Sequence, residues 1–154
     1  MEDVKRVYVA GKLNDMAVGY NYNRHKMLNT GELLREAGYA PYVPCLIEQM
    51  GIMFGWEKYS DYFNFSQPWL AVSDAVLLVE GWETSKGTIE EIQFALEHKI
   101  PVFDRLDELW SHFKGIPGGA IVGLTHESDG TVVGCIKERN VLPEEEMLYD
   151  ASRT

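Results

Sequence analysis

The strongest constraint on the fold is the segment Asp74-Ala-Val-Leu-Leu-Val79, which is apolar at every position after its aspartate. A strand with one face in water would alternate polar and apolar side chains, because successive side chains point to opposite faces. Continuous apolar strands are instead typical of parallel sheets, in which helices cover both faces. The segment therefore predicts a buried strand in a parallel α/β sheet.

Strands and helices are expected to alternate around this segment through the first 115 residues. Shorter apolar runs predict strands over 6–11, 39–44 and 100–103. Helical spacing of apolar residues predicts helices over 21–37, 88–98 and 106–113. This alternation predicts an open, mostly parallel, Rossmann- or flavodoxin-like sheet with flanking helices and right-handed crossovers.

Prolines set two local expectations. The segment 39–44 contains Pro41 and Pro44, which argue against a central place in the sheet for this strand. Residues 45–72 are expected to be helical in pieces, with Pro68 forcing a break or a helix start.

Residues 116–154 form an extension to this core. Apolar runs over 120–124 and 131–136, joined through Glu127-Ser-Asp-Gly130, predict a β-hairpin, and an acidic tail follows from Pro143. We interpret the chain as one domain with its core at about 5–115. The sheet does not need the extension, so we expect it to pair with a second copy in a homodimer or higher even-numbered oligomer. The alternative is that the hairpin covers an edge of its own sheet.

Charge and composition exclude several classes of function. The 154-residue chain has 14 Lys and Arg against 24 Asp and Glu, a net charge of −10, which disfavours binding to nucleic acids. No apolar run approaches the roughly 20 residues of a membrane span, and no basic amphipathic stretch would bind a membrane surface. Two cysteines and four histidines show no ligand spacing. We therefore expect a cytoplasmic protein without a metal or cofactor.

Two loops are candidates for a binding site, because ligands of parallel sheets bind at the carboxyl ends of the strands. One begins at Gly11, after the first strand, and the other spans 80–87 and ends in Ser85-Lys86-Gly87 directly before a helix. Backbone N–H groups at a helix start attract anions, and here a hydroxyl and an ammonium group would add to that attraction.

The same residues also fit a purely structural interpretation. Thr88-Ile-Glu-Glu91 matches a capping box, in which Thr88 would cap the helix and Glu91 would bond back to it. At 100° per residue, Glu90 falls opposite the apolar stripe of this helix and Glu91 at its edge. Glu91 is therefore either a capping group or a carboxylate beside an anion site, where it would meet a phosphorylated sugar.

These segments resemble a known family. Tyr8-Val-Ala-Gly11, together with Ser85-Lys-Gly-Thr-Ile-Glu-Glu91-Ile and a following Ala95, resembles the nucleoside 2-deoxyribosyltransferase superfamily, which includes the 2′-deoxynucleoside 5′-monophosphate N-glycosidases. The resemblance covers about residues 6 to 104 and carries the pattern Ser-x-Gly-x-x-x-Glu. It implies that Glu91 is the nucleophile and that a neighbouring subunit completes the active site.

The resemblance also implies a substrate and a reaction. Glu91 would attack C1′ of the sugar and form a glycosyl ester, which water or a second base then resolves. Ser85 stands where the nucleotide hydrolases carry a serine and the nucleoside transferases an aspartate, which favours a 5′-monophosphate. Lys86 and the Gly87 N–H would contact that phosphate, and Lys12 either adds a second positive charge or is solvated.

One departure leaves the second catalytic group open. The family places an aspartate in the helix before the third strand, where this chain has Ser66, with Asp61 about a turn and a half earlier. Asp74 begins a strand and is expected at the opposite edge of the sheet. Either Asp61 or a water held by Ser66 takes the role, or catalysis is absent. The chain is thus an N-glycosidase, a base-exchanging deoxyribosyltransferase or a non-catalytic nucleotide-binding module.

Aromatic residues have two interpretations each. Trp82 lies in the second loop and either stacks on a base or packs in the core, and Tyr8 either contacts the sugar or base or is a core residue. Trp69 is expected in the core. A further apolar group is expected either to cover the base as a lid or to form an intersubunit patch: Met50, Met53, Phe54 and Trp56.

Overall fold

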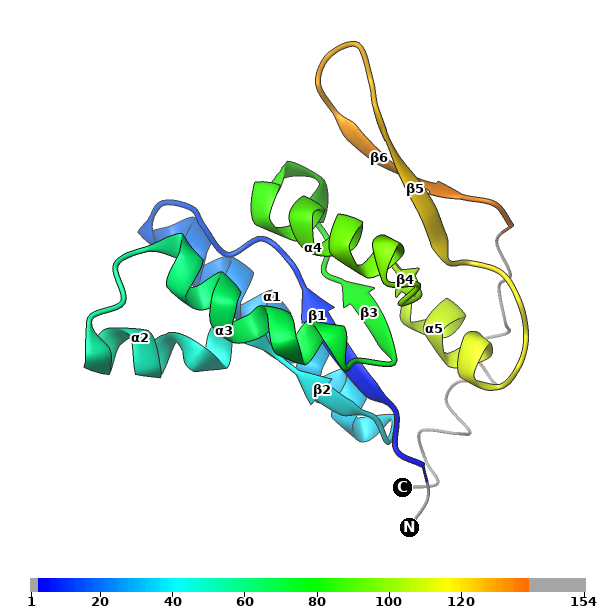
Figure 1. Cartoon of the computed structure of the whole chain (residues 1–154), viewed down its shortest axis with the longest axis horizontal. Helices are drawn as coiled ribbons and strands as arrows, with labels where there is room; N and C mark the ends of the chain where they lie inside the picture. Colours follow the sequence, from blue (N-terminus) through cyan, green and yellow to red (C-terminus); the bar gives the residue numbers. More distant parts are fainter. Residues whose placement is uncertain (1–2, 139–154) are drawn as a thin grey trace.

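The computed structural model describes residues 3–138 and is built around a parallel sheet of four strands (Figure 1). The strands are β1 (Arg6–Ala10), β2 (Ala40–Tyr42), β3 (Ala75–Leu78) and β4 (Val102–Phe103). Their order is β2-β1-β3-β4, and each neighbouring pair is parallel. The expected α/β sheet is confirmed, and β2 lies at an edge, as its prolines predicted.

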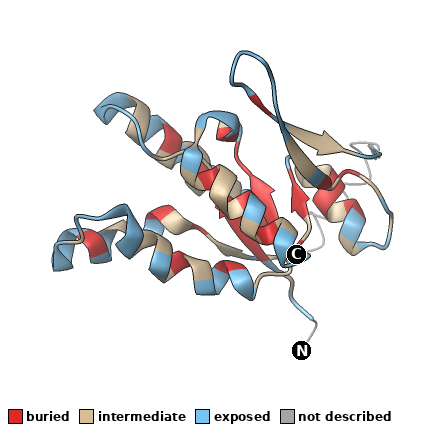
Figure 2. Cartoon of the chain, turned by 45° about the horizontal axis from the view of Figure 1, so that its top comes forward, coloured by how far each residue is buried: buried red, intermediate tan, exposed pale blue. Residues whose placement is uncertain are grey.

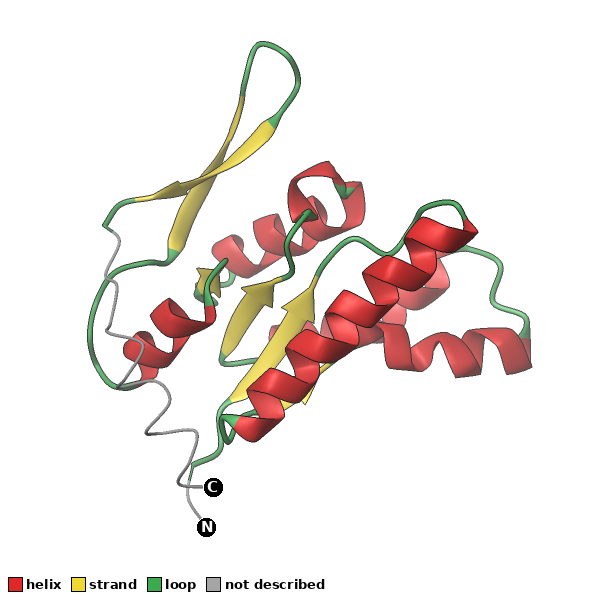
Figure 3. Cartoon of the chain, turned by 180° about the vertical axis from the view of Figure 1, so that it is seen from behind, coloured by secondary structure: helices red, strands yellow, loops and turns green. Residues whose placement is uncertain are grey.

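Helices cover both faces of the sheet. One face packs against α1 (Ala17–Glu36) and α5 (Leu106–Phe113), and the other packs against α3 (Tyr59–Ala71) and α4 (Lys86–Glu97). Figure 3 shows α1 lying along the sheet when the molecule is seen from behind. The connection from β2 to α3 contains two short elements, η1 (Pro44–Ile47) and α2 (Glu48–Phe54). A third short element, η2 (Trp82–Thr84), lies between β3 and α4.

The core has two halves, one on each face of the sheet. Side chains of β1 alternate between them: Tyr8 and Ala10 pack towards α3 and α4, whereas Val7 and Val9 pack towards α1 and α5. All four residues of β3 are buried, as its apolar run predicted, and Figure 2 shows the central strands as the most buried part of the chain. A strand covered on both faces holds its carboxyl end, and the loop after it, in a fixed place.

Two predictions about α3 were wrong. Pro68 lies inside the helix rather than at a break or start, although a proline cannot donate the helical hydrogen bond of its own residue. Buried Ser66 and Leu70 on either side of it hold the helix against the sheet. Trp69 is 51% exposed instead of lying in the core, and its ring stacks on Tyr42 with centroids 5.8 Å apart.

The hairpin forms a separate two-stranded sheet that projects from the body of the molecule (Figure 1). Its strands are β5 (Ile121–His126) and β6 (Val132–Ile136), which pair antiparallel as expected. Ile121 at the base of the hairpin and Val132 beside its turn are buried in the core half that also contains Ile92 and Val102. The hairpin therefore packs along α4, η2 and β4. The predicted acidic tail lies outside the described residues.

Within residues 3–138, no helix combines the length and the apolar character that crossing a membrane would require.

Candidate active site

A pocket of about 630 Å³ opens at the carboxyl ends of β1 and β3. This volume is ordinary for a small-molecule site, and the position is the usual one in parallel α/β sheets. Several segments line it, namely the loop after β1, two residues of α1, the η1–α2 segment, the first half of α3 and the first turns of α4. The residues are Gly11, Lys12, Leu13, Asn14, Tyr20, Met27, Pro44, Ile47, Glu48, Glu57, Tyr59, Tyr62, Phe63, Ser66, Thr84, Ser85, Lys86, Gly87, Thr88 and Glu91.

Glu91 is the carboxylate of the pocket that the sheet itself positions. The hydroxyl of Tyr8, a fully buried residue of β1, donates a hydrogen bond of 2.7 Å to Glu91 Oε1. Burial raises the pKa of Glu91 to about 7, against the opposing effect of the Tyr8 hydrogen bond. Burial and the charge of Glu91 in turn raise the pKa of Tyr8, which keeps its hydroxyl a donor. One carboxylate oxygen is thus fixed by a neutral donor.

The capping-box prediction was wrong. Ser85 is the N-cap of α4, and its hydroxyl oxygen accepts hydrogen bonds from the Thr88 backbone N–H at 3.3 Å and the Thr88 hydroxyl at 2.9 Å. Because α4 begins at Lys86, two residues earlier than predicted, Thr88 lies buried within its first turn. Glu91 bonds to Tyr8 rather than back to the cap, so it is a pocket residue and not a capping residue.

The start of α4 provides donors for an anion. The first intrahelical bond runs from the Ile89 N–H to the Ser85 carbonyl, so the N–H groups of Lys86 and Gly87 precede the helical ladder. A hydroxyl can accept two hydrogen bonds and still donate one. Since both bonds from Thr88 are accepted by Ser85, its own hydrogen remains to be donated to a ligand. The exposed side chain of Lys86 adds a positive charge at the same place.

Glycines at two positions of this site leave room for a neighbouring side chain. A Cβ on Gly87 would lie 2.6 Å from the hydroxyl oxygen of Tyr59, which begins α3 and lies over the start of α4. A Cβ on Gly11 would lie 2.8 Å from Cβ of Val79, so this glycine lets the chain after β1 approach the chain after β3. Gly11 therefore shapes the floor of the pocket.

Lys12 and Ser66 also reach the pocket, each with another partner. Lys12 forms an ion pair of 3.5 Å with Asp15, and its side chain is 32% exposed. Ser66 is buried, and its hydroxyl oxygen lies 3.3 Å from that of Tyr42.

Asp61 and Trp82 are not brought to the pocket. Five residues at 100° each place Asp61 far around α3 from Ser66, and it is exposed in the first turn of that helix. Trp82 is 4% exposed and packs in the core half that contains Leu78. Gly81 before it has a φ of 91°, and the chain turns there into η2, which holds Trp82 in the core.

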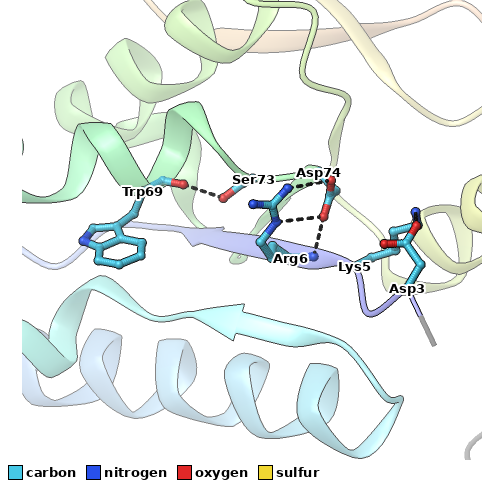
Figure 4. Close-up of polar contacts among 6 residues, drawn as sticks. All are labelled: Asp3, Lys5, Arg6, Trp69, Ser73 and Asp74. Carbon is cyan, nitrogen blue, oxygen red and sulfur yellow. Dashed lines mark hydrogen bonds and ion pairs between the residues drawn. The ribbon is translucent and has the colours of Figure 1, made fainter. Parts of the chain in front are cut away.

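Asp74 lies at the opposite edge of the sheet, as expected. Its carboxylate accepts a hydrogen bond of 2.7 Å from the Arg6 backbone N–H and one of 3.3 Å from Arg6 Nε (Figure 4). Both residues stand at the amino ends of their strands, away from the pocket. Asp74 therefore fastens β3 to β1 and has no part in the site.

Sequence reasoning missed the polar residues that α1, α2 and α3 contribute. Tyr20 and Glu48 line one side of the pocket, and Tyr59 lies near Glu91, whose charge together with burial raises the pKa of Tyr59 to about 12. For Glu48 and Tyr59 the only signal was the aromatic-rich composition of residues 45–72, which does not show which side chains face the sheet.

Comparison with known proteins identifies a family. A family model described as a domain of unknown function, DUF4406, matches residues 5–104. The chain belongs to this family. The match spans all four parallel strands and every residue that lines the pocket, whereas the hairpin lies beyond it. No curated protein and no solved structure matches the chain.

A metal centre has no support in the part of the chain that the structure describes. Nowhere between residues 3 and 138 do three His, Cys, Asp or Glu side chains come together in a way that could hold a metal ion.

We expect ionisation of Glu91 to destabilise the fold. Its pKa of about 7 exceeds the ordinary 4.5, so between these values the folded chain holds a proton that the unfolded chain has released, and stability falls as the pH rises. This difference corresponds to at most about 3 kcal/mol. In urea unfolding, Glu91→Gln should match the wild type at about pH 4 and exceed its free energy of unfolding by up to that amount at about pH 8.

Tyr8→Phe is the matched variant for this measurement. It removes the hydrogen bond that favours the ionised form of Glu91, so the loss of stability should extend to higher pH. A difference between Glu91→Gln and wild type that is the same at both pH values would contradict the raised pKa.

Proposed function

We propose that the protein is an N-glycosidase that hydrolyses the N-glycosidic bond of 2′-deoxynucleoside 5′-monophosphates. One observation carries the proposal: Glu91, held by Tyr8, shares a pocket with the donors at the start of the same helix. Glu91 lies four residues beyond Gly87, which is about 6 Å along a helix axis. This separation suits a nucleotide whose phosphate binds the helix start while C1′ of its sugar faces the carboxylate.

The proposed reaction has two displacement steps at C1′. An oxygen of Glu91 bonds to C1′ as the N-glycosidic bond breaks, and the bonding electron pair leaves with the base, which takes up a proton. Water then attacks C1′ of the glycosyl ester, releasing the deoxyribose 5-phosphate and the free carboxylate, with retention at C1′. Because Tyr8 holds Oε1, the Oε2 atom of Glu91 is the one available to C1′. The charge of Glu91 also stabilises the cationic transition state.

We assign the second catalytic role, the transfer of a proton to or from the base, to a water held by Ser66. Of the two candidates that the sequence offered, Asp61 is exposed outside the pocket, whereas Ser66 is buried and lines it. The hydroxyl oxygen of Tyr42 lies 3.3 Å from that of Ser66, and either hydroxyl can donate in this pair. A water bound there would face the sugar from the α3 side of the pocket and could carry a proton to or from the base.

The phosphate end of the site supports a nucleotide over a nucleoside. The hydroxyl hydrogen of Ser85, the N–H groups of Lys86 and Gly87 and the ammonium group of Lys86 all favour a negatively charged ligand. Lys12, in the loop after β1, adds a second positive charge when a phosphate competes with Asp15. Both cysteines among the described residues are free thiols, which fits the reducing cytoplasm where free nucleotides occur.

The first experiment is an assay of base release. We expect wild-type protein incubated with each 2′-deoxynucleoside 5′-monophosphate to release free base, detected by chromatography. Glu91→Gln should lower turnover at least about 1,000-fold because it removes the nucleophile while keeping an acceptor for Tyr8.

Glu90→Gln is the control, since it removes the neighbouring carboxylate and should retain near wild-type turnover. Base exchange that requires an added acceptor base would identify a deoxyribosyltransferase instead, and binding without turnover a nucleotide-binding module. Near wild-type activity of Glu91→Gln would overturn the assignment of the nucleophile.

Ser85→Asp tests the phosphate site. A carboxylate at the N-cap can still accept the Thr88 N–H bond, so α4 keeps its start, but its charge repels the phosphate. We expect kcat/KM to shift from the monophosphate towards the free nucleoside by about tenfold or more. Ser85→Ala, which removes the hydroxyl without adding charge, should weaken the monophosphate reaction without this gain for the nucleoside. An unchanged preference in Ser85→Asp would place the phosphate elsewhere.

We also propose that the protein is a homodimer or a higher even-numbered oligomer. The apolar side chains of α2 support an interface: Ile52, Met53 and Phe54 are 74%, 74% and 69% exposed, and none of them lines the pocket. This position favours the intersubunit interpretation of the segment over a lid. Trp56 packs on Tyr62 with ring centroids 5.3 Å apart and so belongs to its own subunit's fold.

Light scattering at micromolar concentration measures this assembly. We expect a mass of at least twice the 17.5 kDa of one chain. Phe54→Lys places a charge on the α2 face and Val122→Lys places one on the 60% exposed position of the hairpin, so the variant that lowers the mass locates the interface. A mass of 17.5 kDa for the wild type, with activity retained, would overturn the proposal.

A further inference from the structure

The pocket contains a second largely buried carboxylate that the proposed reaction does not use. Glu48 begins α2, its side chain is 17% exposed, and it lines the pocket. Arg24 Nε forms an ion pair of 3.3 Å with Glu48 Oε2, and burial together with the neighbouring Glu48 carboxylate raises the pKa of Tyr20. Both residues belong to α1, so this neighbouring helix holds the Glu48 side chain in place.

The order of the strands places Glu48 at the end of the pocket opposite the phosphate site. The donors at the start of α4 follow β3, whereas Glu48 follows the crossover from β2, and β1 lies between these strands. Strands β2 and β3 themselves are separated by two strand spacings of about 4.8 Å each. A nucleotide with its phosphate at α4 and its C1′ at Glu91 therefore extends its base towards β2, into the part lined by Pro44, Ile47 and Glu48.

The partners of Glu48 determine what it can recognise. A carboxylate only accepts hydrogen bonds, and it has capacity for about four, so the ion pair with Arg24 leaves acceptor positions free. A base is therefore selected by the N–H donors on its edge. Guanine presents two adjacent donors, N1–H and the 2-amino group, whereas thymine presents one N–H flanked by two carbonyl oxygens that a carboxylate repels.

We propose that Glu48 is the base-recognition residue and that it selects guanine. This inference rests on the proposed function and narrows its substrate to 2′-deoxyguanosine 5′-monophosphate. Hypoxanthine keeps N1–H and lacks only the 2-amino group, so the corresponding inosine nucleotide isolates one of the two hydrogen bonds. A hydrogen bond to a charged group that is lost in this way costs about tenfold or more in affinity.

The test measures binding in the Glu91→Gln protein by calorimetry, so that the ligands are not consumed. We expect the guanine nucleotide to bind about tenfold or more tightly than the inosine nucleotide, and the thymidine nucleotide to bind most weakly. In Glu91→Gln/Glu48→Gln these differences should fall to about twofold, because an amide offers a donor as well as an acceptor. Glu32→Gln is the matched control, since it breaks an exposed pair between a glutamate and Arg35 on α1 outside the pocket.

The outcomes separate the two proposals. Base release from several nucleotides without a guanine preference, or a preference that survives Glu48→Gln, overturns the role of Glu48 and leaves the N-glycosidase intact. A wild-type protein that neither binds nor cleaves any of the nucleotides overturns both. The comparison of the guanine and inosine nucleotides needs no substitution at Glu48, so the absence of a guanine preference overturns the inference even if Glu48→Gln does not fold.

Discussion

The parallel pairing of β1 with β3 is the interaction on which the site depends. Val7 to Ala10 pair in register with Ala75 to Leu78, and Gly11 lets the chain pass against Val79 just beyond the last pair. Tyr8 comes from the first of these strands and Glu91 from the helix after the second. Their hydrogen bond therefore forms only when the two strands are in register. A shift by one residue would turn the Tyr8 side chain to the other face of the sheet.

The proposed binding of an anion by this acidic chain has to be a local effect. The net charge of −10 opposes the approach of a phosphate, but charges beyond about 10 Å are largely screened at ordinary ionic strength. Within that distance, the start of α4 supplies N–H groups, a hydroxyl and the ammonium group of Lys86. The partial positive charge of a helix start falls off within one turn, and Glu91 lies just beyond it, so burial dominates and raises its pKa.

The sequence predicted the features that depend on residues close together in the chain, and it did not predict those that depend on packing between distant segments. The buried run of β3, the helix over 106–113 and the hairpin are local patterns, and all three are confirmed. The positions of Ser85 and Glu91 were predicted because one helix sets their separation. Asp61 was misjudged because an offset along α3 does not show which face meets the sheet. Glu48 was missed because its place depends on how α2 packs on α1, and short-range patterns carry no signal for that packing.

Glu91 and Glu48, the two carboxylates of the pocket to which roles are given above, differ in their partners, and this difference fits the roles proposed for them. The oxygen of Glu91 is held by a neutral phenol, so the carboxylate keeps electron density to donate to carbon. A guanidinium at the same distance would stabilise the free anion more strongly and make it a poorer nucleophile. Glu48 instead pairs with a guanidinium, that of Arg24 at 3.3 Å, which suits a group that must keep its direction while ligands bind and leave. If Glu91 had the guanidinium and Glu48 the phenol, both proposed roles would be weakened. A nucleophile has to leave its partner to attack carbon, whereas a recognition group has to stay bound to its partner.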